Sequence, residues 1–213
     1  MMRTFFCLTV VLLLTSLASA QVTVNKQPVT STVRYFDPKK PPADMPKLVG
    51  NEAAVCVSNF NISASAGGDV LEQDKVDGAC RTTVRIDRIT LTLECDIVIW
   101  LPNKPPKKIV EHEDGHKEIT ERFYKDADAI AKKYANQWLG RSMRGSGKTC
   151  QEASSAAISS AAQEMSGQYM TAVQGESSKV QEAYDRITAH GTNKLTARQG
   201  VDRAMAEYER TKR

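Results

Sequence analysis

The clearest pattern in the chain lies between residues 81 and 101. In its second half, apolar side chains occupy every second position, and threonine or acidic residues fill most positions between them. Successive side chains of a strand point to opposite faces, so this alternation predicts a β-strand with one buried side. Val84 and Ile86 have the opposite phase, and we expect a bend or bulge near Asp87 and Arg88 to join the two segments. The alternating apolar positions are Ile89, Leu91, Leu93, Cys95, Ile97 and Ile99.

Weaker strand signals precede this segment. Residues 22–35 alternate loosely between apolar and polar side chains, and residues 54–63 form another β-like segment. A proline-rich stretch at residues 37–46 separates the two and is typical of a loop. Together these segments predict that residues 21–101 form a β-rich half, built as an antiparallel sheet.

Beyond Pro102 the apolar residues recur with a helical period. They predict one long helix from about Lys107 to Leu139, because prolines 105 and 106 are tolerated in a first helical turn. Residues 140–147 are rich in glycine and arginine, and we expect a flexible loop there. The further helices expected are 150–175, 177–190, which Gly191 would end, and 196–213. The β-rich half and the helical half, 107–213, predict one α+β domain over residues 21–213.

The first twenty residues have the features of a secretory signal peptide. Arg3 provides a positive start, a short apolar run follows, and small residues precede an expected cleavage between Ala20 and Gln21. This run is too short to span a bilayer, and no later segment approaches the roughly 20 apolar residues that a membrane helix needs. We therefore expect a secreted or periplasmic protein without membrane insertion.

Charge and cysteine content narrow the classes further. The formal net charge is +4 without a long basic run, so nucleic acid is a poor candidate partner. Four cysteines follow the expected cleavage site, and an even number in an exported protein predicts two disulfides with three possible pairings. A cysteine-rich zinc site is the weaker alternative, because no C-x-x-C pair exists. The four are Cys56, Cys80, Cys95 and Cys150.

The residues that carry candidate chemistry are His112-Glu113-Asp114-Gly115-His116, an H-E-x-x-H motif in the long predicted helix. Residues four apart share a helix face, so both imidazoles can reach one Zn²⁺ ion, and Glu113 lies where it can take a proton from a water molecule. The motif can also arise by chance on a helix that carries ion pairs. Two of the three histidines of the chain lie here, in line with the apolar stripe, and this favours a zinc hydrolase.

A catalytic zinc ion usually has three protein ligands. A third histidine six residues after the second would define one class of zinc protease, but Arg122 occupies that position. A helical glutamate, such as Glu152 or Glu164, would define another class. His190 is the more economical choice, since it is the one other histidine and lies on an apolar helix face. The alternative is that His190 simply caps its helix.

Two segments resemble a known family. Residues 110–119, V-E-H-E-D-G-H-K-E-I, and residues 184–191, Y-D-R-I-T-A-H-G, are similar to the predicted secreted zinc-dependent proteases of bacteria, once filed as a domain of unknown function. The resemblance implies a zincin-like fold and a peptide or protein substrate. It also implies ligand roles for His112, His116 and His190, and a catalytic role for Glu113.

The second of these segments adds two further expectations. The resemblance suggests that Tyr184 stabilises the oxyanion of the reaction and that Asp185 orients a ligand imidazole, although ordinary core packing is an equal alternative for Tyr184. Residues 81–101 would offer a strand edge to the substrate. Two other classes stay open, a non-catalytic zinc-binding envelope protein and a partner-docking module without metal.

Overall fold

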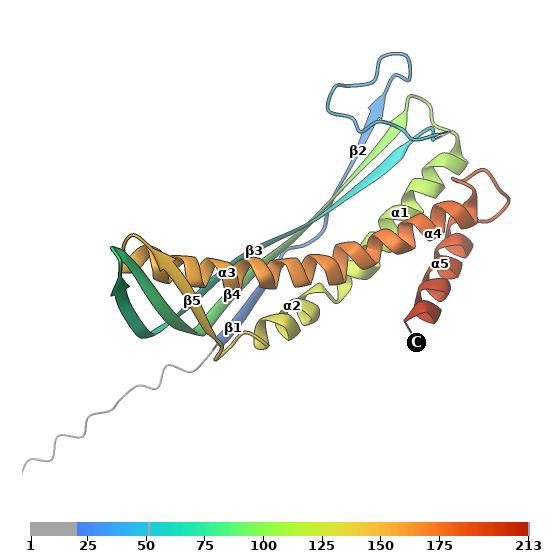
Figure 1. Cartoon of the computed structure of the whole chain (residues 1–213). Coiled ribbons are helices and arrows are strands. Elements are labelled where there is room, and N and C mark those ends of the chain that lie inside the picture. The colour runs from blue at the N-terminus through green and yellow to red at the C-terminus, as the bar shows by residue number, and fades with distance from the viewer. Residues whose placement is uncertain (1–20, 51, 213) are drawn as a thin grey trace, which may run out of the picture.

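The computed structural model describes residues 21–50 and 52–212, so the expected signal peptide lies outside the described residues. The strands are β1 (Gln21–Lys26), β2 (Thr30–Phe36), β3 (Val55–Val76), β4 (Ala79–Pro102) and β5 (Ser142–Gly147). The helices are α1 (Lys107–Lys125), α2 (Ala127–Asn136), α3 (Cys150–Met170), the π-helical turn η1 (Thr171–Gly175), α4 (Glu176–Thr188) and α5 (Ala197–Thr211). The helices pack along one side of a long, narrow sheet (Figure 1).

The sheet is organised around β4. β3 and β4 form a long hairpin whose turn residues, Asp77 and Gly78, both have positive φ angles, as a tight two-residue turn requires. β3 covers one edge of β4 along its whole length, and β5, β1 and β2 follow one another along the other edge.

The expectation of a purely antiparallel sheet was wrong, because β1 and β2 run parallel to β4. Together they resemble one interrupted strand. β1 pairs with residues 88–93 of β4, and β2 pairs with residues 96–102. Pro28 lies in the interruption and has no N–H to donate to the ladder. An alternating pattern identifies a strand but carries no information on its direction, so the sequence did not disclose this pairing.

The expected irregularity in β4 is confirmed. The register shifts at Gly67 and Gly68 of β3, which pair with Arg88 and Ile86, so Asp87 is the extra residue of a bulge. Without a bulge, residues three apart in a strand would point to opposite faces. The extra residue reverses this alternation, so Ile86 and Ile89 both face the helices and are buried.

The helical half differs from the expected elements at two places. The helix expected over 107–139 breaks at Asp126, whose φ and ψ of −102° and 13° lie outside the helical range. Contacts with the sheet account for the break, because the Tyr124 hydroxyl donates to the Leu93 carbonyl and Lys26 donates to the Lys125 carbonyl. The two helices expected over 150–175 and 177–190 are instead one continuous helical rod, with η1 between α3 and α4.

The flexible loop expected over 140–147 is instead strand β5, paired with residues 80–85 of β4. Its glycines are needed because α3 lies directly against it. A Cβ atom at Gly145 would come within 2.0 Å of the Ala153 carbonyl oxygen, and one at Gly147 within 2.6 Å of Glu152 Cβ. Close packing against a helix, which depends on residues elsewhere in the chain, turns this glycine-rich segment into a strand.

The cysteines form one disulfide, Cys80–Cys150, which ties β4 to the start of α3. The expected second bridge is absent from the described residues, because Cys56 pairs with Ile99 of β4, whereas Cys95 lies four residues before Ile99 in the same strand. Four strand residues span about 13 Å, well beyond the reach of a disulfide. The one bridge is compatible with an extracellular protein, and no described helix has the length and apolar character to cross a bilayer.

Removal of the disulfide by Cys80→Ala and Cys150→Ala is expected to lower the free energy of unfolding by about 4 kcal/mol. The bridge closes a loop of 70 residues and so restricts the unfolded chain. Urea unfolding measures the effect. Cys95→Ala is the control and should cost about 1 kcal/mol, since it removes one buried sulfur atom and no crosslink. Equal losses for both variants would contradict the prediction.

Candidate metal centre

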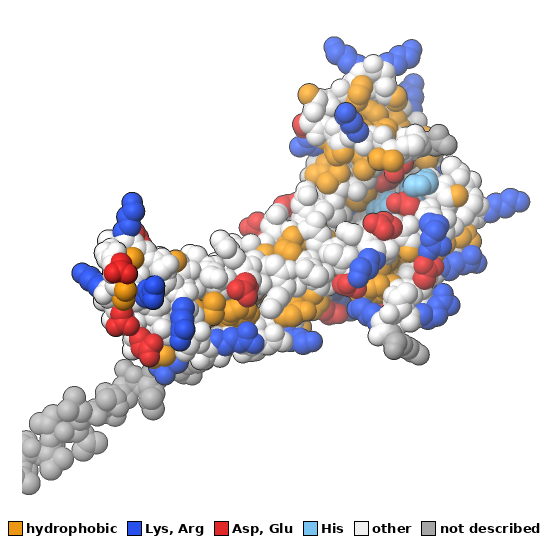
Figure 2. Space-filling view, viewed as in Figure 1, with side chains coloured by type: hydrophobic (Ala, Val, Ile, Leu, Met, Phe, Trp, Pro, Cys, Tyr) orange, Lys and Arg blue, Asp and Glu red, His pale blue; other side chains and the backbone are white. Residues whose placement is uncertain are grey.

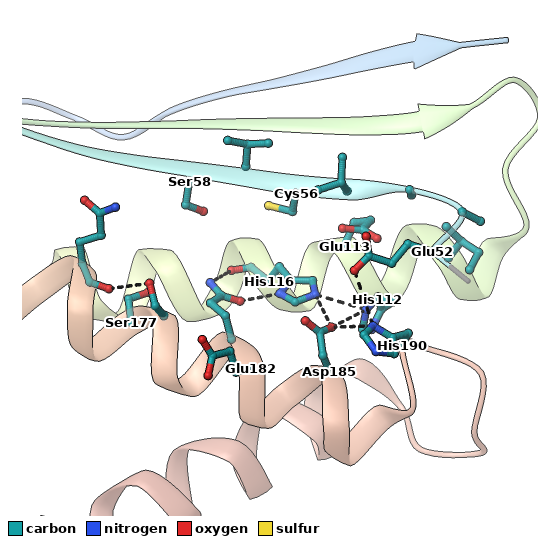
Figure 3. Close-up of a pocket in the computed structure, with 18 of the residues that line it drawn as sticks. Glu52, Cys56, Ser58, His112, Glu113, His116, Ser177, Glu182, Asp185 and His190 are labelled. Carbon is teal, nitrogen blue, oxygen red and sulfur yellow. Dashed lines mark hydrogen bonds and ion pairs between the residues drawn. The ribbon is translucent and has the colours of Figure 1, made fainter. Parts of the chain in front are cut away.

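The candidate site lies between two antiparallel helices. α1 contributes His112, Glu113 and His116, and α4 contributes Asp185 from the facing side (Figure 3). His112 and His116 are four residues apart, so one face of α1 presents both rings to α4. The facing residues of α4 follow the spacing i, i+3, i+4 and i+7 and so form one stripe. They are Gln181, Tyr184, Asp185 and Thr188.

Three ligand atoms converge at the centre of this interface. Asp185 Oδ1 lies 2.9 Å from His116 Nε2 and 3.2 Å from His112 Nε2, and the two Nε2 atoms are 3.2 Å apart. Among the described residues, these three side chains are the group whose ligand atoms come close enough to hold one metal ion.

The orientation of the His116 ring is set by Gln181. The Gln181 amide nitrogen donates to the His116 carbonyl and to the Thr120 hydroxyl, so its Oε1 faces His116 Nδ1 at 2.5 Å. An amide oxygen only accepts, and Nδ1 must therefore carry the proton. Nε2 is then an unprotonated acceptor that points at Asp185, as a metal ligand requires.

Thr188 sets the His112 ring in the same way. Its hydroxyl donates to the Tyr184 carbonyl at 2.7 Å and is therefore left to accept from His112 Nδ1 at 3.4 Å. His112 Nε2 is then also an acceptor. Because two imidazole lone pairs and a carboxylate oxygen face one another, the arrangement requires a shared proton or a cation.

The acid–base properties of the site reflect this geometry. Burial alone would raise the pKa of Asp185, but the adjacent His112 and His116 side chains outweigh it and lower the pKa well below the usual range. Burial lowers the pKa of His112. Burial acts the same way on His116, but the Asp185 carboxylate overcomes it and raises the pKa of that imidazole. The site thus stabilises positive charge beside Asp185.

Glu113 lies on the opposite flank of the histidines, between α1 and the start of β3 (Figure 3). Its side chain is buried, and this desolvation raises its pKa to about 7, although His116 pulls the pKa down. A carboxyl with this pKa exchanges protons near neutral pH, which suits a general base.

Glu113, both histidines and Asp185 line one cavity of about 360 Å³. Its opposite wall is formed by residues 53–58, which lead into β3 and form its first residues, and the outer edge of β3 pairs with no strand of the described chain. The expectation that residues 81–101 offer the substrate edge was wrong, because other strands pair with both edges of β4. β3 is the edge strand beside the site.

Tyr184 lies beneath the site and does not line this cavity. Its ring stacks on His112 at a centroid distance of 4.9 Å, and its hydroxyl donates to the His112 carbonyl at 3.2 Å. The side chain is fully buried, which does not support the oxyanion role that the resemblance suggested. Gly115 makes room for it, since a Cβ atom at position 115 would come within 2.1 Å of the Tyr184 hydroxyl.

His190 lies at the border of the site, just beyond α4. Ala189, His190 and Gly191 all have left-handed φ angles, which turn the chain sharply at the helix end. His190 Nδ1 is 3.7 Å from Asp185 Oδ1 and 3.8 Å from Glu52 Oε1, and its side chain is 51% exposed. His190 thus lines the cavity, but it lies outside the close group formed by His112, His116 and Asp185.

The glutamates considered as other third ligands lie away from the site. Glu152 belongs to the capping box at the start of α3, where it accepts from backbone amides. Glu164 is exposed and borders a separate hollow beside Tyr134. Asp128 pairs with Lys26.

Gln181 and Thr188 were not predicted from the sequence, and Asp185 was expected only to orient an imidazole. The spacing from Gln181 to Thr188 marks one helix face, and this signal was available in the sequence. The position of that face against the H-E-x-x-H helix depends on the tertiary fold.

Comparison with known proteins gave no match, whether to protein-family models, curated proteins or solved structures. The chemistry of the site therefore rests on its own residues.

Gly115→Ala is expected to destabilise the protein by about 3 kcal/mol, because the new methyl group collides with the buried Tyr184 hydroxyl. Urea unfolding monitored by circular dichroism measures the change. Gly167→Ala is the matched control, since a Cβ atom at that exposed position in α3 meets nothing within 4 Å. The control should stabilise the protein by up to about 1 kcal/mol. A neutral Gly115→Ala would refute the packing described here.

Proposed function

We propose that the protein is an exported, zinc-dependent peptidase. The observation that carries the proposal is the convergence of three acceptor atoms, His112 Nε2, His116 Nε2 and Asp185 Oδ1, in a cavity that also contains the buried acid Glu113. A purely structural metal site has no need for an additional acid beside it.

The donor atoms fit zinc. Two neutral imidazoles and one carboxylate form a set that catalytic zinc sites use, with a further position left for water. Hydrogen bonds from Nδ1 of each ring fix the tautomer and direct Nε2 to the ion. When bound, zinc supplies Lewis-acid activation of water and of a peptide carbonyl at neutral pH.

The side chains of this site can perform the proton transfers of peptide hydrolysis. Glu113 accepts a proton from the attacking water and returns it to the leaving amine, and a pKa of about 7 suits both steps. Asp185 keeps negative charge close to the imidazoles. Gln181 and Thr188 hold the rings in place during the reaction.

The start of β3 gives the substrate a place to bind. An extended peptide can add to the unpaired edge of residues 53–58 and lie across the cavity, with its backbone bonded to β3. Backbone pairing of this kind positions a peptide bond whatever the side chains of the substrate are.

Glu113→Gln is expected to lower peptide cleavage by at least about 100-fold, because a neutral amide cannot act as a base. Bound zinc, measured by elemental analysis, should stay unchanged. Asp114→Asn is the matched control, since this neighbouring carboxylate is exposed and should leave cleavage unaffected. Retained zinc with no cleavage in either the wild type or Glu113→Gln would favour a non-catalytic zinc-binding protein.

Replacement of the α4 carboxylate tests the ligand set. Loss of a residue that only orients a metal ligand weakens metal binding roughly 10–100-fold. Asp185→Asn should weaken zinc binding by more than this, and His190→Ala should weaken it by less than this. Competition with a chromogenic chelator measures both. A larger loss with His190→Ala would make His190 the third ligand, as the family resemblance implies. A protein that takes up no zinc at all would favour a docking module.

A further inference from the structure

An apolar groove lies next to the metal centre, in the lobe formed by the end of β2 and the proline-rich loop. Figure 2 shows hydrophobic side chains gathered on this lobe, beside the exposed histidine. The groove has a volume of about 770 Å³, which is within the roughly 300–1,000 Å³ typical of ligand pockets. Its half-buried walls include Pro42, Met45 and Leu48, and its charged lining residues are Lys47 and Glu52.

The groove adjoins the cavity of the metal centre. Glu52 and Ala53 line both, so the two hollows meet at the point where β3 begins. A chain that follows the β3 edge from Ser58 to Ala53 crosses the metal centre and arrives at the groove. This shared border distinguishes the groove from an isolated apolar patch.

We propose that the groove is a substrate subsite that selects peptides with a bulky apolar side chain close to the cleaved bond. This inference rests on the proposed peptidase function. The occupant is an apolar side chain because proline, methionine, leucine and phenylalanine dominate the lining.

The direction of β3 also sets the side of the cleaved bond. β3 runs from the groove at Ala53 toward Ser58. A substrate that pairs antiparallel to β3 runs the other way, so its C-terminal part reaches the groove. For a substrate in this antiparallel orientation, the preferred apolar residue follows the cleaved bond.

Binding of synthetic peptides to the Glu113→Gln protein tests the subsite without cleavage. Two peptides of otherwise equal sequence carry either leucine or aspartate in their C-terminal half, and calorimetry measures both. The leucine peptide should bind at least about 10-fold more tightly, as expected for an apolar pocket.

Leu48→Asp in the same protein should remove this preference. Val49→Asp is the matched control, because it adds the same charge to the neighbouring residue, whose side chain is 71% exposed and outside the groove. Met45→Gln is a second, milder variant, and unchanged zinc binding in each variant shows that the fold is retained.

The outcomes separate the subsite from the peptidase proposal. Selective binding that Leu48→Asp abolishes, together with a wild-type protein that cleaves no peptide, would keep the groove and overturn the peptidase. Equal binding of both peptides, or equal effects of Leu48→Asp and Val49→Asp, would overturn the groove. Loss of binding to phosphatidylglycerol vesicles in Leu48→Asp, with peptide binding unchanged, would identify a lipid surface as the occupant and likewise overturn the proposal.

Discussion

Mutual repulsion of three acceptor atoms is the constraint on which the site depends. His112 Nε2, His116 Nε2 and Asp185 Oδ1 approach to about the length of a hydrogen bond, and no proton of their own fills the space once Gln181 and Thr188 hold the Nδ1 protons. Such a cluster is stable only around positive charge. The interface between α1 and α4 thus does more than pack two helices, because its three acceptor atoms favour a shared proton or a cation between them.

Packing around this interface explains residues that carry no chemistry. Gly115 leaves space for Tyr184, and Gly191 leaves space for His112, since a Cβ atom at position 191 would come within 2.9 Å of that side chain. Gly200 of α5 gives Tyr184 and Thr188 room from the other side. Small residues at these three positions allow α1, α4 and α5 to approach closely enough for short side chains to meet.

Local features of the fold could be predicted from the sequence, and features that depend on distant partners could not. The phase change near Asp87 revealed the bulge, and the H-E-x-x-H motif revealed the two histidines. The parallel direction of β1, the strand at Gly145 and the break at Asp126 are each decided by contacts with distant parts of the chain. The same is true of Asp185, because only the packing of α4 on α1 brings its carboxylate to the imidazoles.

The dependence of the whole sheet on β4 has a consequence for the order of folding. β1 and β2 lie near the start of the described chain, yet the strand with which they pair ends only at Pro102. During synthesis, these first strands emerge with unpaired backbone groups, because their partner strand lies roughly seventy residues later in the chain. Assembly of the sheet is therefore a late event that depends on contacts between distant residues. A chain that has not yet completed its sheet exposes unpaired strand edges to other protein chains.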